Sequence, residues 1–129
     1  MKKILVAEDN DSNFILMTYI LKRFYEFERA KNGQEAVDLV ESGAYDLVLM
    51  DIKMPVMDGL EATKTIRKME RADAATIPIV ALTANAFEED VQHSMQAGLN
   101  AHLTKPVEAE ALFEVLTKLL KGNSSVPGD

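Results

Sequence analysis

Short apolar runs alternate along the chain with longer stretches in which apolar residues recur every three or four positions. The short runs predict strands at residues 4–7, 27–30, 47–50, 78–82 and 101–103. The longer stretches have the period of helices with one buried face, and they predict helices at residues 11–24, 32–43, 60–70, 87–97 and 108–120. A polar loop is expected at 71–76, so the pattern consists of five strand–helix units.

This alternation predicts a doubly wound α/β fold. Continuously apolar strands separated by helices indicate a parallel sheet that is covered on both faces. Crossovers between parallel strands are right-handed, and the common flavodoxin-like order for five strands is 2-1-3-4-5. The 129 residues suit a single domain. We assign residues 1–122 to this domain, with five helices flanking the sheet, and expect 123–129 to be a flexible tail or linker.

Charge and composition exclude several classes of partner. The net charge of −7 argues against nucleic-acid binding by this domain alone, because its field repels phosphate backbones. No apolar stretch approaches the roughly 18 residues of a membrane span, and acids rather than a cleavage site close the first apolar run. The absence of cysteine excludes a thiolate metal site and fits a reducing compartment. We therefore expect a cytoplasmic domain that makes no membrane contact of its own.

Polar side chains that could bind a ligand or take part in a reaction lie where the predicted strands end. They are Glu8, Asp9, Asp51, Thr83 and Lys105. Open α/β sheets bind ligands at the carboxyl ends of their strands, at the point where the strand order reverses. In the order 2-1-3-4-5 this point lies between strands one and three, so the three carboxylates are expected to share one crevice.

Three carboxylates in one crevice repel each other and favour a hard divalent cation, with Mg²⁺ preferred over Ca²⁺ where few protein ligands leave room for water and phosphate. A cation, a lysine and a hydroxyl around one carboxylate suit phosphoryl transfer, with Asp51 as the nucleophile. Taken singly, each residue could instead be a helix cap or a solvated side chain. The joint pattern of five suitable residues at the correct strand ends favours the site.

Four blocks of the sequence resemble the signature blocks of two-component response-regulator receiver domains. The blocks are residues 4–10 together with Asn13, then 45–59, 81–86 and 103–106. They keep the family's order, and the resemblance covers nearly the whole chain. Their style is similar to that of receivers attached to hybrid sensor histidine kinases. The resemblance implies a signalling domain operated by phosphorylation rather than an enzyme, although such a domain catalyses its own phosphoryl transfer and dephosphorylation and can be part of a hybrid histidine kinase.

The resemblance also implies roles for individual residues around the acceptor. Asp51 would take a phosphoryl group from a phosphohistidine on a histidine kinase or a histidine phosphotransfer domain. Asp9, Asp51 and the backbone carbonyl of Lys53 would ligate Mg²⁺, or Mn²⁺ in its place, and Glu8 would act through a metal-bound water.

Further residues would detect the phosphoryl group. Thr83 and Lys105 would contact it, and the bond between Lys105 and Pro106 is expected to be cis. Three residues before the lysine, where many receivers carry Tyr or Phe as the moving switch residue, this chain has His102. A histidine could serve as the switch, but a half-exposed histidine on an edge strand with no coupling role is the competing interpretation. Phosphorylation is expected to shift the domain between two existing conformations.

Competing functions meet specific obstacles in the sequence. An aspartate-nucleophile phosphatase needs a second acid two residues after its nucleophile, and Lys53 stands there. A flavin-binding module needs a phosphate loop after the first strand, where residues 8–11 are acidic or amide side chains. The alternative that stays open is a pseudo-receiver, a docking module without phosphorylation. The partner kinase, the output and the oligomeric state are not specified by the sequence.

Overall fold

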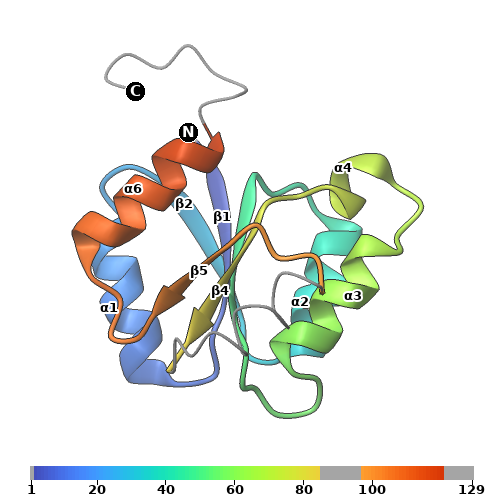
Figure 1. Cartoon of the computed structure of the whole chain (residues 1–129), viewed down its shortest axis with the longest axis horizontal. Helices are drawn as coiled ribbons and strands as arrows, with labels where there is room; N and C mark the ends of the chain where they lie inside the picture. The colour runs from blue at the N-terminus through green and yellow to red at the C-terminus, as the bar shows by residue number, and fades with distance from the viewer. Residues whose placement is uncertain (1, 85–96, 121–129) are drawn as a thin grey trace.

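The computed structural model describes residues 2–84 and 97–120, which form a parallel sheet between two layers of helices (Figure 1). The strands are β1 (Lys3–Ala7), β2 (Glu26–Ala30), β3 (Leu47–Asp51), β4 (Ile79–Thr83) and β5 (Ala101–Thr104). Their order is β2-β1-β3-β4-β5, and every neighbouring pair is parallel. The predicted doubly wound sheet is confirmed.

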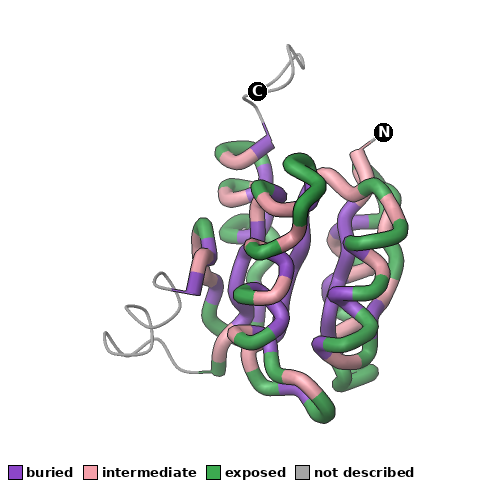
Figure 2. Tube along the Cα trace, turned by 90° about the vertical axis from the view of Figure 1, so that its right-hand side faces the viewer, coloured by how far each residue is buried: buried purple, intermediate pink, exposed green. Residues whose placement is uncertain are grey.

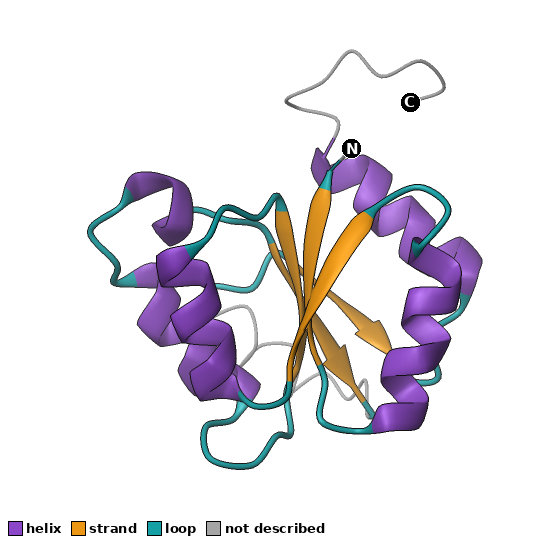
Figure 3. Cartoon of the chain, turned by 180° about the vertical axis from the view of Figure 1, so that it is seen from behind, coloured by secondary structure: helices purple, strands orange, loops and turns teal. Residues whose placement is uncertain are grey.

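Helices cover both faces of this sheet, as Figure 3 shows from behind. One face carries α1 (Asp11–Leu21) and α6 (Ala109–Leu120), and the other carries α2 (Gly33–Ser42), α3 (Gly59–Arg67) and the short α4 (Ala72–Ala75). The helix predicted at 87–97 lies almost wholly outside the described residues, as does the tail at 123–129. Within the described part of the chain, no helix has the length and apolar character needed to cross a membrane.

The central strand explains the continuous apolar runs. Leu47 and Leu49 of β3 pack with the cluster under α1 and α6, whereas Val48 and Met50 pack with the cluster under α2 and α3. Successive side chains of a strand point to opposite faces, so a strand covered on both sides is apolar at every position. The buried residues accordingly line the interior between the layers (Figure 2). Packing on both faces holds β3 in place, and Asp51 is the last residue of this strand.

Two helices, α1 and α3, end earlier than predicted. Helix α1 ends at Leu21 rather than at residue 24, and Phe24 lies 58% exposed with its ring edge against Phe113. Its apolar side chain therefore serves a surface contact between elements rather than the buried face of α1. Helix α3 ends at Arg67 rather than at residue 70.

The polar loop predicted at 71–76 was wrong, because α4 forms there. Three of its four residues are alanine, the residue with the highest helix propensity, and Ala74 is buried against the core. Asp73, which made the segment look polar, forms an ion pair with Arg71 at 2.7 Å. Propensity and burial of one small side chain were enough for a single turn of helix.

Candidate functional site

Three carboxylates meet at the carboxyl ends of β1 and β3. Asp51 is the last residue of β3 and is 4% exposed, and Glu8 follows β1 and is fully buried. Asp9, the next residue, is exposed. One carboxylate oxygen from each of the three lies within 4.8 Å of the other two. The structure thus brings the predicted acidic residues together at the predicted switch point between the two strands.

Hydrogen bonds fix the loop that carries two of these acids. The Glu8 N–H donates to the Ala30 carbonyl at 3.0 Å, which extends the pairing of β1 with β2 by one residue. Asn10 donates its N–H to Glu8 Oε2 at 3.2 Å, and its side chain accepts from the Asn13 N–H at 3.0 Å as the cap of α1. Capping starts the helix immediately after the acids, so Glu8 and Asp9 are held in a short, ordered turn.

Lys105 bridges the two buried carboxylates. Its Nζ lies 3.0 Å from Glu8 Oε1 and 2.9 Å from Asp51 Oδ2, and its side chain is 19% exposed. The Lys105 N–H donates to the Thr83 carbonyl at 2.7 Å, so the ends of β4 and β5 are joined beside the site. The bond between Lys105 and Pro106 is cis, the form that the resemblance implies.

The pKa values of Glu8 and Lys105 respond to this arrangement. Burial raises the pKa of the Glu8 carboxyl to about 7, Asp51 adds to the rise, and the hydrogen bond from Lys105 opposes it. Burial alone would lower the pKa of Lys105, but its hydrogen bonds to Asp51 and Glu8 outweigh that effect, so the pKa is raised. Lys105 therefore stays cationic, while Glu8 is poised between its two protonation states near neutral pH.

The donor set fits a hard divalent cation. Three carboxylates face one lysine, so the pocket is short of positive charge when all three are ionised, and every donor is an oxygen. Asp51 Oδ1 also accepts the Lys53 N–H at 3.2 Å, which orients the acceptor carboxylate. The predicted metal contact of the Lys53 carbonyl stays a prediction.

Thr83 and His102 lie on the neighbouring strands. Thr83 ends β4 and is partly exposed, facing Thr104 of β5 in the sheet register. His102 is half-buried on β5 opposite Ala81. Thr83 therefore stands at the same sheet edge as Asp51, and the predicted roles of Thr83 as a phosphate ligand and of His102 as a switch stay predictions.

The sequence interpretation missed Arg29. This residue lies one position before the end of β2, and its Nε–H donates to the Glu8 carbonyl at 3.0 Å. Its Nη2 lies 2.8 Å from Asp11 Oδ1. A lone arginine on a weakly patterned strand gives no signal by itself, and only the parallel pairing of β2 with β1 shows which loop it reaches.

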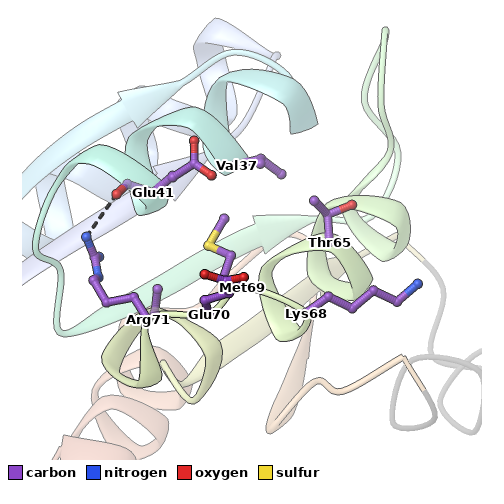
Figure 4. Close-up of a pocket in the computed structure, with 8 residues that line it drawn as sticks. Val37, Glu41, Thr65, Lys68, Met69, Glu70 and Arg71 are labelled. Atoms are coloured by element: carbon purple, nitrogen blue, oxygen red, sulfur yellow. Dashed lines mark hydrogen bonds between the residues drawn. The ribbon is translucent and has the colours of Figure 1, made fainter.

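A separate cavity lies between α2 and the region of α3 and α4 (Figure 4). Its volume is about 480 Å³, and its wall contains Val37, Glu41, Thr65, Lys68, Met69, Glu70, Arg71 and Ala74. None of the predicted site residues borders it. This cavity is therefore separate from the candidate site, which the clustered acids and lysine identify.

Known proteins match the chain along most of its length. The family model described as the response regulator receiver domain matches residues 4–117. The chain is 40% identical over 121 residues to hybrid signal transduction histidine kinase I of Dictyostelium discoideum, a match that covers 89% of this chain and 7% of that protein. The chain thus corresponds to a small part of this curated relative.

Solved receiver domains have the same fold. One is the receiver domain of sensor histidine kinase PA1611 from Pseudomonas aeruginosa PAO1, with a magnesium ion coordinated in its active-site cleft. It is 37% identical, with a TM-score of 0.85 and coverage of 92% of this chain and 97% of that one. Another is the receiver domain of Ssk1 from Saccharomyces cerevisiae, co-crystallised with the histidine phosphotransfer protein Ypd1. It is 34% identical, with a TM-score of 0.89 and coverage of 99% and 94%.

Proposed function

The chain belongs to the family of response regulator receiver domains, and on that premise we propose that Asp51 accepts a phosphoryl group from a phosphohistidine of a partner protein. The observation that carries the proposal is the position of Asp51, buried at the end of β3 between two further carboxylates and 2.9 Å from the Lys105 ammonium. A structural aspartate at a strand end needs neither neighbour.

Asp51 would be the nucleophile of the transfer, and the acidic residues around it would hold the metal ion. A carboxylate oxygen of Asp51 attacks phosphorus, the P–O bond forms, and the P–N bond to the partner's imidazole breaks. Asp9, Asp51 and the Lys53 carbonyl would hold Mg²⁺ or Mn²⁺, with Glu8 acting through a bound water, and the ion would supply neutralising charge at the transferred oxygens.

The other cation in the pocket belongs to the chain itself. Lys105 would pair with a phosphoryl oxygen, and the Thr83 hydroxyl would donate to another. The phosphoryl group adds about two negative charges, and its contacts with Thr83 and Lys105 would favour one of two conformations of the domain, with His102 as the candidate relay. The same pocket would later admit water to hydrolyse the aspartyl phosphate.

The phosphodonor is proposed to be a histidine kinase or a histidine phosphotransfer domain, met in the cytoplasm. Helix α1 presents an apolar surface beside the site, with Ile15, Leu16 and Tyr19 exposed by 61%, 44% and 70%. Leu16 also lines a small hollow with Glu8 and Lys105. A helical donor could cover this surface while its phosphohistidine reaches Asp51. The net charge of −7 makes nucleic acid an unsuitable partner for this domain alone.

The test is labelling with a small phosphodonor such as phosphoramidate in the presence of Mg²⁺, followed by intact-mass measurement. We expect one phosphoryl group on the wild type and none on Asp51→Asn. Asp58→Asn is the matched control, because it makes the same chemical change at the end of the loop that follows Asp51, and an asparagine still caps α3. Equal labelling of Asp51→Asn and the wild type would refute the assignment. An unlabelled wild type would favour the docking module without phosphorylation.

A further inference from the structure

Arg29 reaches from β2 into the loop that carries Glu8 and Asp9. Its guanidinium donates from Nε to the Glu8 carbonyl at 3.0 Å and pairs through Nη2 with Asp11 at 2.8 Å. The same group lies over the Phe14 ring, 4.5 Å from its centroid, and the side chain is 17% exposed. Three contacts of different kinds therefore hold one planar group in one orientation.

The contact at Glu8 acts on the backbone that leads to the next acid. The Glu8 N–H is already bound to the Ala30 carbonyl at 3.0 Å, and Arg29 binds the Glu8 carbonyl on the other side of the residue. That carbonyl belongs to the planar peptide unit whose N–H is that of Asp9. Holding the carbonyl fixes the plane of this unit and therefore the position of the Asp9 Cα, from which the Asp9 side chain leaves the backbone.

We propose that Arg29 is a positioning residue that sets the affinity of the acidic cluster for Mg²⁺, an inference that rests on the proposed function. Metal affinity depends on groups that orient the ligands as well as on the ligands themselves. The contribution of Arg29 is geometric, because Asp11 neutralises its charge at 2.8 Å. A net positive charge beside the cluster would repel the cation, so the geometric role and an electrostatic role predict changes of opposite sign.

Arg71 provides a matched control. Its guanidinium also binds backbone carbonyls, those of Val40, Glu41 and Gly43 at the end of α2, and it pairs with Asp73 (Figure 4 shows the contact with Glu41). It lines the separate cavity and touches none of the three acids. Replacing either arginine by methionine removes a guanidinium that binds backbone carbonyl oxygen and pairs with an aspartate, but only Arg29 does so at the site.

The experiment measures Mg²⁺ binding by isothermal titration calorimetry and stability by urea unfolding for the wild type, Arg29→Met and Arg71→Met. We expect Arg29→Met to bind Mg²⁺ about tenfold more weakly and Arg71→Met to bind as the wild type does, while both variants lose stability. Unchanged or tighter binding by Arg29→Met would overturn the proposal, as would an equal loss of affinity in both variants.

Phe14→Leu gives a second variant should Arg29→Met fail to fold. It removes the ring under the guanidinium without changing any charge, and we expect a smaller weakening of Mg²⁺ binding in the same direction; no change would overturn the proposal. The wild type separates this inference from the proposed function. If the wild type neither binds Mg²⁺ nor becomes phosphorylated, the function fails, whereas a competent wild type matched by Arg29→Met refutes only the role of Arg29.

Discussion

The ionisation of Glu8 should make the stability of the metal-free domain depend on pH. Glu8 is fully buried, and burial raises the pKa of its carboxyl from its ordinary 4.5 to about 7. Below pH 4.5 the carboxyl is protonated in both the folded and the unfolded chain, so the stability that comes from the raised pKa is fully present. As the pH rises toward 7 the unfolded chain releases this proton first, and the folded state loses that stability.

The size of the effect follows from the pKa difference. Each tenfold change in an acid dissociation constant corresponds to about 1.4 kcal/mol. A rise in the Glu8 pKa from 4.5 to about 7 therefore corresponds to a loss of about 3 kcal/mol between pH 4.5 and 7. This is a large part of the free energy of unfolding of a typical domain, which is roughly 5–15 kcal/mol.

Glu8→Gln isolates the contribution of Glu8 ionisation to stability, because glutamine keeps the shape of the side chain and cannot ionise. Urea unfolding of both proteins would be followed from pH 5 to pH 8 with a chelator present. We expect the stability of the wild type to fall by about 3 kcal/mol more than that of Glu8→Gln over this range. Adding Mg²⁺ at pH 8 should then restore stability to the wild type, because the ion supplies the positive charge that three ionised carboxylates lack beside a single lysine. Glu8→Gln has one carboxylate fewer, so Mg²⁺ should stabilise it much less.

The reasoning is refuted if the wild type and Glu8→Gln lose stability in parallel between pH 5 and pH 8. Glu110→Gln serves as the control for a change in net charge, because Glu110 is exposed in the first turn of α6. Its profile should follow that of the wild type.

Two further predictions concern the packing under the site and the surface beside it. A Cβ on Gly59 would lie 2.2 Å from the Asp51 carbonyl oxygen, so Gly59→Ala should force α3 away from β3 and cost about 2 kcal/mol in urea unfolding; unfolding at the wild-type urea concentration would contradict this. Tyr19 is 70% exposed on α1, so Tyr19→Ser should leave stability and labelling by phosphoramidate unchanged while slowing transfer from a histidine phosphotransfer protein; equal transfer rates would exclude Tyr19 from the docking surface.

The positions of the site residues could be predicted because they depend on topology alone. Buried strands were visible as apolar runs, and a parallel sheet brings all their carboxyl ends to one edge. Glu8, Asp51 and Lys105 each follow or end such a run, so their proximity followed from the strand order before any side chain was placed. Asn32 was likewise predictable as the start of α2, and its side chain accepts from the Glu35 N–H at 2.8 Å.

Features that depend on side-chain contacts across elements could not be predicted in this way. The end of α1 is one example, because Phe24 has helical spacing in the sequence but packs its ring against Phe113 of α6. Helix α4 is another, because its formation depends on the burial of Ala74 by neighbours distant in sequence. The hold of Arg29 on Glu8 belongs to the same class, since strand pairing brings residues together that lie 21 positions apart.

The position of Lys105 between Glu8 and Asp51 links the binding of the phosphoryl group to the ionisation of Glu8. One ammonium at 3.0 Å from Glu8 and 2.9 Å from Asp51 serves two buried carboxylates at once. If Lys105 turns to a phosphoryl oxygen on Asp51, the Glu8 carboxylate is left buried without its cation, and an unpaired buried charge is strongly destabilising. The Glu8 charge is then compensated by a proton, which the rise of its pKa to about 7 favours, or by the divalent cation of the proposed site. We therefore expect the release of Lys105 toward the phosphoryl group and the compensation of Glu8 to occur as one linked event.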